Sequence, residues 1–168
     1  MKIDNINTFD IFNGLNNKEI ELFLKKIKNK SYSKNTIIIK EGDVGGSILF
    51  LLSGKINITK SLTLSTDKNN KHDNSEKEFI RCKASDKIII GEISLFSQDN
   101  IRTATMKALS ECEIGYLDNK DFLKICDNNA EVGYKVLKNL VEIVTKKLIN
   151  TNHQVLKLTT AFSLIMES

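Results

Sequence analysis

Between Gly91 and Thr105 the chain reads GEISLFSQDNIRTAT, directly after three isoleucines, Ile88–Ile90. A strand that ends in glycine lets the backbone approach a ligand closely. The following turn, Ile93–Phe96, would begin a short helix, and free N–H groups at a helix start favour anions. Arg102 adds a planar fork of donors that matches phosphate oxygens, and Thr103 adds a hydroxyl. The stretch therefore predicts a site for a phosphate.

The acidic residue next to Gly91, Glu92, cannot serve the phosphate, because its carboxylate would repel it. Beside an anion site, Glu92 makes sense as an acceptor for a neighbouring sugar hydroxyl, and it would also keep Arg102 oriented. A phosphate together with a sugar hydroxyl is the chemistry of a nucleotide. The alternative is a structural ion pair between Glu92 and Arg102, and the spacing alone does not decide between the two.

On both sides of this stretch the pattern is typical of short β-strands with glycine turns between them. Strands are expected at Thr36–Ile39, Ser47–Leu52, Lys55–Thr59, Glu78–Cys82, Lys87–Ile90, Thr103–Ala108 and Glu113–Leu117. Strands at this density indicate a mainly β fold with flanking helices, an antiparallel β-roll of the jelly-roll kind. The polar stretch Ser65–Glu78 is expected to be an exposed hairpin loop, an expansion without a function of its own.

Helical patterns occupy both ends of the chain. Two short amphipathic helices are expected within Phe9–Lys30, broken around Gly14–Asn17. A long helix is expected from Ala130, which divides the chain into a β-roll with N-terminal helices over residues 1–128 and a C-terminal helix over residues 129–168.

Apolar residues of the long helix fall on two faces. One face is a heptad seam with alternating steps of four and three: Leu137, Val141, Val144, Leu148, Thr151, Val155, Leu158, Phe162 and Ile165. A second stripe consists of Val132, Val136, Leu140 and Ile143. One face can pack on the β-roll and the other on a partner helix. Because the seam continues after the second stripe ends, we favour a parallel homodimer; the alternative is a helix that lies wholly on its own domain.

The composition bounds the class of protein. The chain has 168 residues, 40% of them hydrophobic, and a net charge of +4, which fits one ordinary domain with a real core. The basic clusters Lys25–Lys30 and Lys146-Lys147 are interpreted as solvated helix ends rather than a nucleic-acid patch. No signal peptide and no run of membrane-spanning length is visible, so we expect no membrane contact.

Sites for metals, cofactors and catalysis are not expected. The three thiols, Cys82, Cys112 and Cys126, are scattered and odd in number, which argues for a reducing compartment and a cytoplasmic location. His72 and His153 lie near no paired cysteines, so a zinc site is not expected. The sequence contains no nucleophile–base pair, metal cluster or Walker-type loop, so we assign no catalytic residue and predict no enzyme.

Three motifs resemble the cyclic nucleotide-binding domain family. Residues 91–105 are similar to its phosphate-binding cassette, most of all to that of the bacterial catabolite-activator branch. KEGDVGGSILFLLSGKI, at 40–56, resembles the family's Gly-Asp turn followed by an apolar strand, Ser-Gly and a second strand. IFNGLNNKEIELF, at 11–23, resembles its opening helices. The resemblance covers about residues 9–158 and implies a β-roll of about eight strands flanked by helices.

The resemblance implies a role for each residue that matches the cassette. Glu92 would accept from the ribose 2′-hydroxyl, and Arg102 with Thr103 would hold the cyclic phosphate. The residues implied to bind the cyclic nucleotide are Gly91, Glu92, Ile93, Ser94, Arg102 and Thr103, and those implied to line the base and sugar pocket are Ile58, Cys82 and Ile90.

Two further residues, Thr151 and Asn152, are similar to a Thr-Ser pair that touches the adenine from both protomers. Thr151 is also the polar member of the seam. Its alternative role is to fix the register of two helices.

Departures from the family pattern limit what it implies. Val44 stands where proline is common and Lys87 where glycine is usual. The catabolite-activator branch continues into a helix-turn-helix domain, for which Thr159–Ser168 is too short, so DNA binding by this chain alone is not expected.

The sequence predicts a stand-alone sensor, with cyclic AMP favoured over cyclic GMP, that signals to an unknown protein through a conformational change. The alternative is a non-catalytic dimeric scaffold whose pocket is vestigial or holds another small ligand.

Overall fold

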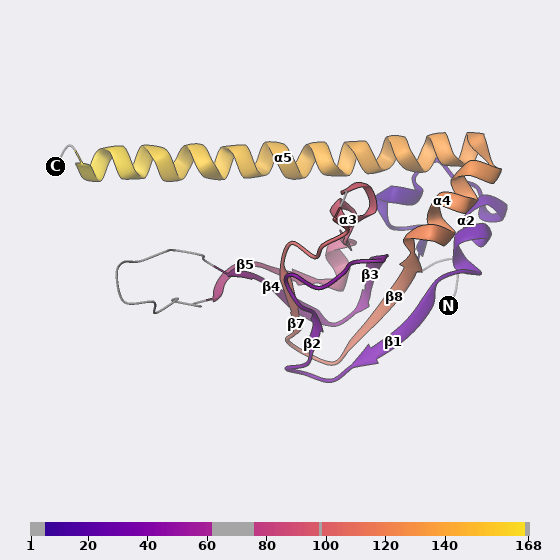
Figure 1. Ribbon diagram of the computed structural model, residues 1–168, viewed down its shortest axis with the longest axis horizontal. Coiled ribbons are helices and arrows are strands. Elements are labelled where there is room, and N and C mark those ends of the chain that lie inside the picture. Colours follow the sequence, from indigo (N-terminus) through magenta and orange to yellow (C-terminus); the bar gives the residue numbers. More distant parts are fainter. Residues whose placement is uncertain (1–5, 62–75, 98, 167–168) are drawn as a thin grey trace.

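Two four-stranded antiparallel sheets form the centre of the protein, and helices flank them (Figure 1). The computed structural model describes residues 6–61, 76–97 and 99–166. The strand orders are β1-β8-β3-β6 and β2-β7-β4-β5. The strands are β1 Lys28–Tyr32, β2 Ile37–Ile39, β3 Ser47–Ser53, β4 Lys55–Ser61, β5 Glu76–Lys83, β6 Ile89–Ile90, β7 Thr105–Ala108 and β8 Cys112–Asp118. The helices are η1 Asp10–Phe12, α2 Asn17–Leu24, η2 Ala84–Asp86, α3 Ile93–Phe96, α4 Asn119–Asn128 and α5 Ala130–Met166. The predicted mainly β-roll with flanking helices is confirmed.

The inner faces of the two sheets enclose one apolar core. Leu49 and Leu51 of β3 belong to this inner cluster, whereas Ile48 and Phe50 of the same strand belong to a second cluster under the helices. Both faces of β3 are therefore covered, which explains why its sequence, SILFLLS, is almost continuously apolar instead of alternating.

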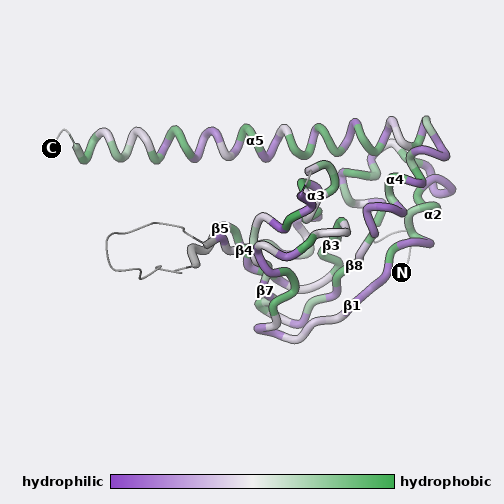
Figure 2. Tube along the Cα trace, in the orientation of Figure 1, coloured by the Kyte–Doolittle hydropathy of each residue, from purple (hydrophilic) through white to green (hydrophobic). Residues whose placement is uncertain are grey.

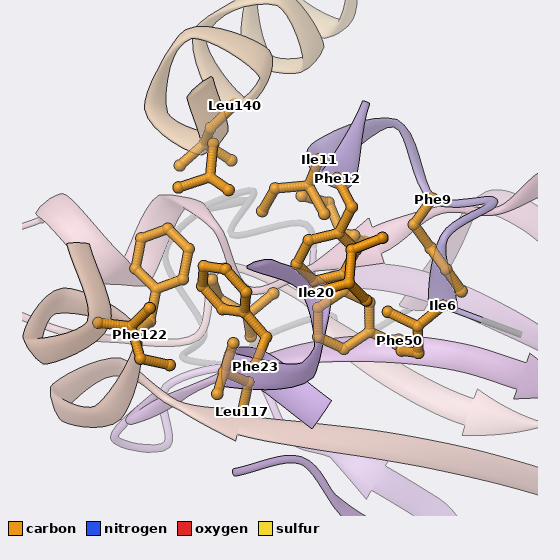
Figure 3. Close-up of a cluster of buried hydrophobic side chains, with 14 of the residues drawn as sticks. Ile6, Phe9, Ile11, Phe12, Ile20, Phe23, Phe50, Leu117, Phe122 and Leu140 are labelled. Carbon is orange, nitrogen blue, oxygen red and sulfur yellow. The ribbon is translucent and has the colours of Figure 1, made fainter. Parts of the chain in front are cut away.

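The second cluster lies between the sheet β1-β8-β3-β6 and the helices, and aromatic rings dominate it (Figure 3). Phe12 stacks on Phe50 with ring centroids 5.7 Å apart, and Phe9 meets Phe50 edge-on at 5.2 Å. Phe23 of α2 and Phe122 of α4 extend the cluster, with centroids 6.0 Å apart. This cluster fixes η1, α2, α4 and the first part of α5 to one face of the roll.

The prediction for Phe9–Lys30 is only partly right. Asp10–Phe12 forms a single 3₁₀ turn and Asn17–Leu24 forms a helix, but Lys28–Tyr32 is an edge strand that pairs with β8. The interpretation of Lys25–Lys30 as a solvated helix end is therefore only partly right: the lysines are exposed and Lys25 caps α2, but Lys28 and Lys30 belong to β1. β1 reads KNKSY and is mostly exposed, so it carries no hydrophobic alternation, and its strand state depends on hydrogen bonds to a segment far away in sequence.

Other boundaries also differ from the predictions, two of them in ways that matter here. The strand expected at Lys87–Ile90 contains only Ile89–Ile90, because Lys87 has a left-handed backbone with φ of 50°. That conformation favours glycine, the residue usual at this position in the family that the sequence resembles. The predicted loop Ser65–Glu78 is too long, since β5 begins at Glu76, and the rest of it lies outside the described residues.

Along α5, the two predicted faces have different surroundings. Val132, Val136 and Leu140 are buried and Ile143 is partly buried against the same cluster, so the second stripe faces the roll. Seam residues beyond the half-buried Leu137 are each at least 41% exposed: Val141, Val144, Leu148, Val155, Leu158, Phe162 and Ile165. The alternative of a helix lying wholly on its own domain is wrong, because every residue from Val144 to Met166 is exposed. Among the described residues, no helix is both long enough and apolar enough to span a bilayer.

Candidate functional site

A cavity of about 550 Å³ lies between the sheet β2-β7-β4-β5, the stretch 88–104 and the middle of α5. The predicted site residues that line it are Ile58, Cys82, Ile90, Gly91, Glu92, Ile93, Ser94, Arg102, Thr103 and Thr151. Asn152 is exposed and does not line this cavity. A contact of Asn152 with the cavity of a second copy stays a prediction.

Gly91 allows the closest backbone approach in the site. Its φ is +89°, a left-handed conformation that favours glycine. A Cβ added there would collide with the guanidinium of Arg102 and would lie 2.7 Å from the carbonyl oxygen of Ser47. The sequence analysis predicted that Gly91 lets a ligand come close to the backbone. In this structure the groups close to Gly91 are the side chain of Arg102 and the backbone of Ser47.

Arg102 is held against the cavity wall by β3 and by α3. Its Nη1 donates to the carbonyl oxygen of Ser47 at 2.9 Å, and its Nη2 donates to the Ser47 hydroxyl at 3.0 Å. Nη1 also donates to the hydroxyl of Ser94 at 3.4 Å, and that hydroxyl in turn donates to the carbonyl oxygen of Gly91 at 2.7 Å. These bonds orient the guanidinium before any ligand arrives.

Arg102 as a whole is only 8% exposed. Burial lowers its pKa from the usual value, while nearby Tyr116 and Glu92 act in the opposite direction. Arginine nevertheless keeps its charge in proteins, so the cavity wall carries a fixed cation. The hydrogen-bond partners of Arg102 are Ser47 and Ser94. The predicted pair in which Glu92 orients Arg102, or forms a structural salt bridge with it, is therefore wrong.

Glu92 instead pairs with α5. Its Oε1 accepts from the Nζ of Lys147 at 2.8 Å, and the same Nζ donates to the carbonyl oxygen of Ile89 at 3.1 Å. The Glu92 side chain is 4% exposed and that of Lys147 is 46% exposed, so the carboxylate is the buried partner. The interpretation of Lys147 as part of a solvated helix end is wrong, because this lysine joins the long helix to the cavity wall.

Replacing Lys147 with methionine should lower the free energy of unfolding by about 1–2 kcal/mol. The value lies between those for exposed and for buried ion pairs, because the lysine is half exposed and the carboxylate is buried. Urea denaturation measures it. The neighbouring variant Lys146→Met is the matched control, since Lys146 only reaches Asp10 at 4.0 Å, and it should change stability little. Adding Glu92→Gln to Lys147→Met should recover part of the loss; equal effects of Lys146→Met and Lys147→Met would contradict the assignment.

The sequence analysis missed the other α5 residues that line the cavity. Lys147, Asn150 and Gln154 join Thr151 there. A signal for them exists in the sequence: they continue the spacing of the stripe that ends at Ile143, in steps of three and four. The face that packs on the roll near the start of α5 thus becomes the cavity wall further along the helix.

The chemical character of the cavity changes from one wall to the next. The Arg102 guanidinium lies near the start of α3, where the first N–H groups of a helix have no partner within it. The carboxylate of Glu92 also lines the cavity, and so do apolar side chains of the sheet such as Ile58 and Met106. This combination fits a small ligand with an anionic group, a hydroxyl and an apolar ring system. Within the described residues, no three His, Cys, Asp or Glu side chains gather as metal ligands would.

Comparisons with known proteins agree on one family. The sequence description of the cyclic nucleotide-binding domain matches residues 29–129. The chain is 26% identical over 136 residues to the cAMP-activated global transcriptional regulator CRP of Pasteurella multocida (strain Pm70), covering 81% of this chain and 58% of that protein.

Solved structures of similar fold include the catabolite activator protein of Thermus thermophilus, with a TM-score of 0.73 and 21% identity over 89% of this chain and 63% of that one. Cyclic AMP-bound PfPKA-R is similar with a TM-score of 0.58 and 29% identity, covering 73% of this chain and 39% of that one. The chain thus spans less than two thirds of the length of each of these relatives.

Proposed function

The chain belongs to the cyclic nucleotide-binding domain family, and on that premise we propose that it is a sensor of a 3′,5′-cyclic nucleotide, with cyclic AMP preferred over cyclic GMP. The observation that carries the proposal is that Arg102 and Glu92 line one cavity, although they make no pair with each other. One side chain offers donors to a phosphate and the other offers an acceptor to a sugar hydroxyl, which are the two requirements of a cyclic nucleotide.

In this proposal the cyclic phosphate binds at the Gly91 end of the cavity. Arg102, Thr103 and the N–H groups at Ile93 and Ser94 would hold it, since a helix start and a guanidinium both favour an anion. Glu92 would accept from the ribose 2′-hydroxyl. Ile58, Cys82 and Ile90 would contact the sugar and the base through apolar surface.

The preference for adenine is supported by the hydrogen bond of Thr151. Its hydroxyl donates to the carbonyl oxygen of Lys147 at 2.9 Å, so its only proton is already used and its oxygen can only accept a further bond. Adenine presents an amino group at the position where guanine presents a carbonyl oxygen. If the base reaches Thr151, the adenine amino group can therefore donate to the threonine oxygen, whereas the guanine carbonyl oxygen would face another acceptor.

Signalling would pass through the Lys147–Glu92 contact. A ribose hydroxyl that binds Glu92 changes the surroundings of the carboxylate that ties α5 to the cavity wall. A ligand can shift the position of α5 only if its contacts differ between the ligand-free and the ligand-bound arrangement of the helix. In our proposal the Lys147–Glu92 ion pair is the contact that differs. In our proposal α5 forms a parallel homodimer through Leu137, Val141, Val144, Leu148, Thr151 and Val155. A downstream protein in the cytoplasm recognises the shifted position of α5. We propose no enzymatic activity.

A thermal denaturation series tests nucleotide binding. Cyclic AMP at one hundred times its dissociation constant should add about 2.7 kcal/mol of stability, which raises the Tm by about 5–10 °C for a domain of this size. Cyclic GMP should raise the Tm less at the same concentration, and linear 5′-AMP should have little effect. A Tm that does not respond to any cyclic nucleotide would favour the scaffold alternative, in which Lys147 and Ser47 permanently occupy Glu92 and Arg102.

A further inference from the structure

Three polar side chains line the cavity outside the contacts of the proposed nucleotide site: Lys60 of β4, and Asn150 and Gln154 of α5. Figures 1 and 2 show α5 running over the roll past α3, with hydrophilic and hydrophobic stretches alternating along the helix. All three residues are exposed, and their side chains form no hydrogen bond or ion pair within the described part of the chain. They are therefore free to contact a ligand.

An adenine base that reaches Thr151 has further polar atoms to satisfy. The Thr151 oxygen can accept from one hydrogen of the 6-amino group, because the hydroxyl proton is used on the carbonyl oxygen of Lys147. The other amino hydrogen and the ring acceptor N7 lie side by side on the edge of the base. Each loses binding free energy if it leaves water without gaining a partner. A side chain that both donates and accepts satisfies the two atoms together.

Of the three unused side chains, only the amides combine a donor with an acceptor, since the ammonium group of Lys60 cannot accept. An asparagine or glutamine amide pairs with adenine through two bonds: its oxygen accepts from the 6-amino group and its NH₂ group donates to N7. Guanine presents two acceptors at this edge, so the amide oxygen would face one of them. An amide contact at this place therefore favours adenine, as the Thr151 oxygen does.

Gln154 is better placed than Asn150 to act together with Thr151. Residues three apart on a helix are neighbours on one face, which puts Gln154 beside Thr151. Helical side chains lean toward the N-terminus of their helix, so the long Gln154 side chain leans over the turn that carries Thr151. The shorter Asn150 side chain leans away from Thr151, toward the turn of Lys147. Gln154 is also not one of the seam residues proposed for the homodimer, so that interface does not use its side chain.

We propose that Gln154 is a specificity-determining residue that pairs through its amide with the 6-amino group and N7 of the adenine base, while Thr151 accepts the second amino hydrogen. The inference rests on the proposed binding of a cyclic nucleotide and adds a residue that distinguishes the base. Arg102 and Glu92 then hold the phosphate and the ribose at one wall of the cavity, and α5 recognises the base at another.

Isothermal titration calorimetry on the full chain tests the contact with cyclic AMP and with its 7-deaza analogue, in which a C–H group replaces N7. The unchanged protein should bind the analogue about 3- to 5-fold more weakly, which is the effect of one hydrogen bond. Gln154→Met keeps the length of the side chain and removes the amide. This variant should bind cyclic AMP about 5- to 10-fold more weakly than the unchanged protein does, and it should bind the two ligands equally.

Two control variants come from the same part of α5. His153 precedes Gln154 and does not line the cavity, so His153→Met should keep both affinities. Asn150→Leu removes the other amide of the cavity wall and should keep the ratio of the two affinities. The ligand-free variants should have the Tm of the unchanged protein, because all three side chains are exposed.

The outcomes separate this contact from the nucleotide site as a whole. If the unchanged protein binds both ligands equally, or if Gln154→Met keeps the difference between them, Gln154 does not contact N7 and the inference is wrong, although the site remains. A difference that disappears in Asn150→Leu instead would equally overturn the role of Gln154. If the unchanged protein binds neither ligand, the proposed sensor function fails together with this inference.

Discussion

Replacing Arg102 with alanine is expected to weaken the binding of cyclic AMP by at least about 100-fold, or about 3 kcal/mol, since charge-assisted hydrogen bonds to a phosphate would be lost. Arg102→Lys should recover little of the affinity, because lysine keeps the charge but lacks the planar fork that Ser47 and Ser94 hold in place. Isothermal titration calorimetry measures both variants.

The effect on binding has to be separated from an effect on folding. Arg102→Ala leaves the Ser47 hydroxyl without its donor, so the ligand-free protein should lose about 1–2 kcal/mol of stability as well. Lys107→Ala is the matched control, because Lys107 is an exposed cation of β7 and does not line the cavity, although its neighbour Met106 does. It should bind cyclic AMP like the unchanged protein. An Arg102→Ala variant that folds and keeps the original affinity would refute the assigned phosphate site.

Replacing Gly91 with alanine is expected to damage the fold and the site together. The left-handed backbone at φ +89° costs a residue with a side chain about 1–3 kcal/mol. The new methyl group would also collide with the Arg102 guanidinium and would crowd the Ser47 carbonyl oxygen. We therefore expect a fall of about 2–4 kcal/mol in the free energy of unfolding and no rise in Tm with cyclic AMP. Urea denaturation and the thermal series measure the two effects.

Two other glycines separate the causes of this loss. Gly42 has a φ of +87° but open space around an added Cβ, so Gly42→Ala should show the backbone cost alone. Gly46 has open space and no left-handed backbone, so Gly46→Ala should show neither effect. If Gly91→Ala lowers stability no more than Gly42→Ala and keeps the cyclic AMP response, the collision with Arg102 has no consequence and the described geometry of the site is wrong.

Several elements could be predicted because the signal is local. The isoleucine run that ends in Gly91 and the Arg-Thr pair at 102–103 are contiguous in sequence, and they form one wall of the cavity. The apolar stripe Val132, Val136 and Leu140 has the helical period, so it predicted the buried face of α5 correctly. Burial of this kind follows from spacing, since spacing decides which side chains share a face.

Other features could not be predicted, because they depend on segments far apart in the chain. β1 is polar and becomes a strand only through its ladder with β8. The partners of the two charged site residues were also assigned wrongly: Glu92 pairs with Lys147, 55 residues away, and Arg102 binds Ser47, also 55 residues away. Sequence proximity suggested that Glu92 and Arg102 pair with each other, but the packing of α5 and β3 beside the site offers each of them another partner.

By itself, the sequence determined the β-roll, the glycine at the tight approach and the side chains that line the cavity near residues 91–103, because hydrophobic periodicity and backbone preference act over a few residues. Only the tertiary structure decided that α5 crosses the cavity, that Lys147 ties this helix to Glu92 and that Arg102 is oriented by Ser47. The physical reason is that a buried charge takes the partner that folding brings within hydrogen-bond distance, and distance along the chain does not determine which group that is.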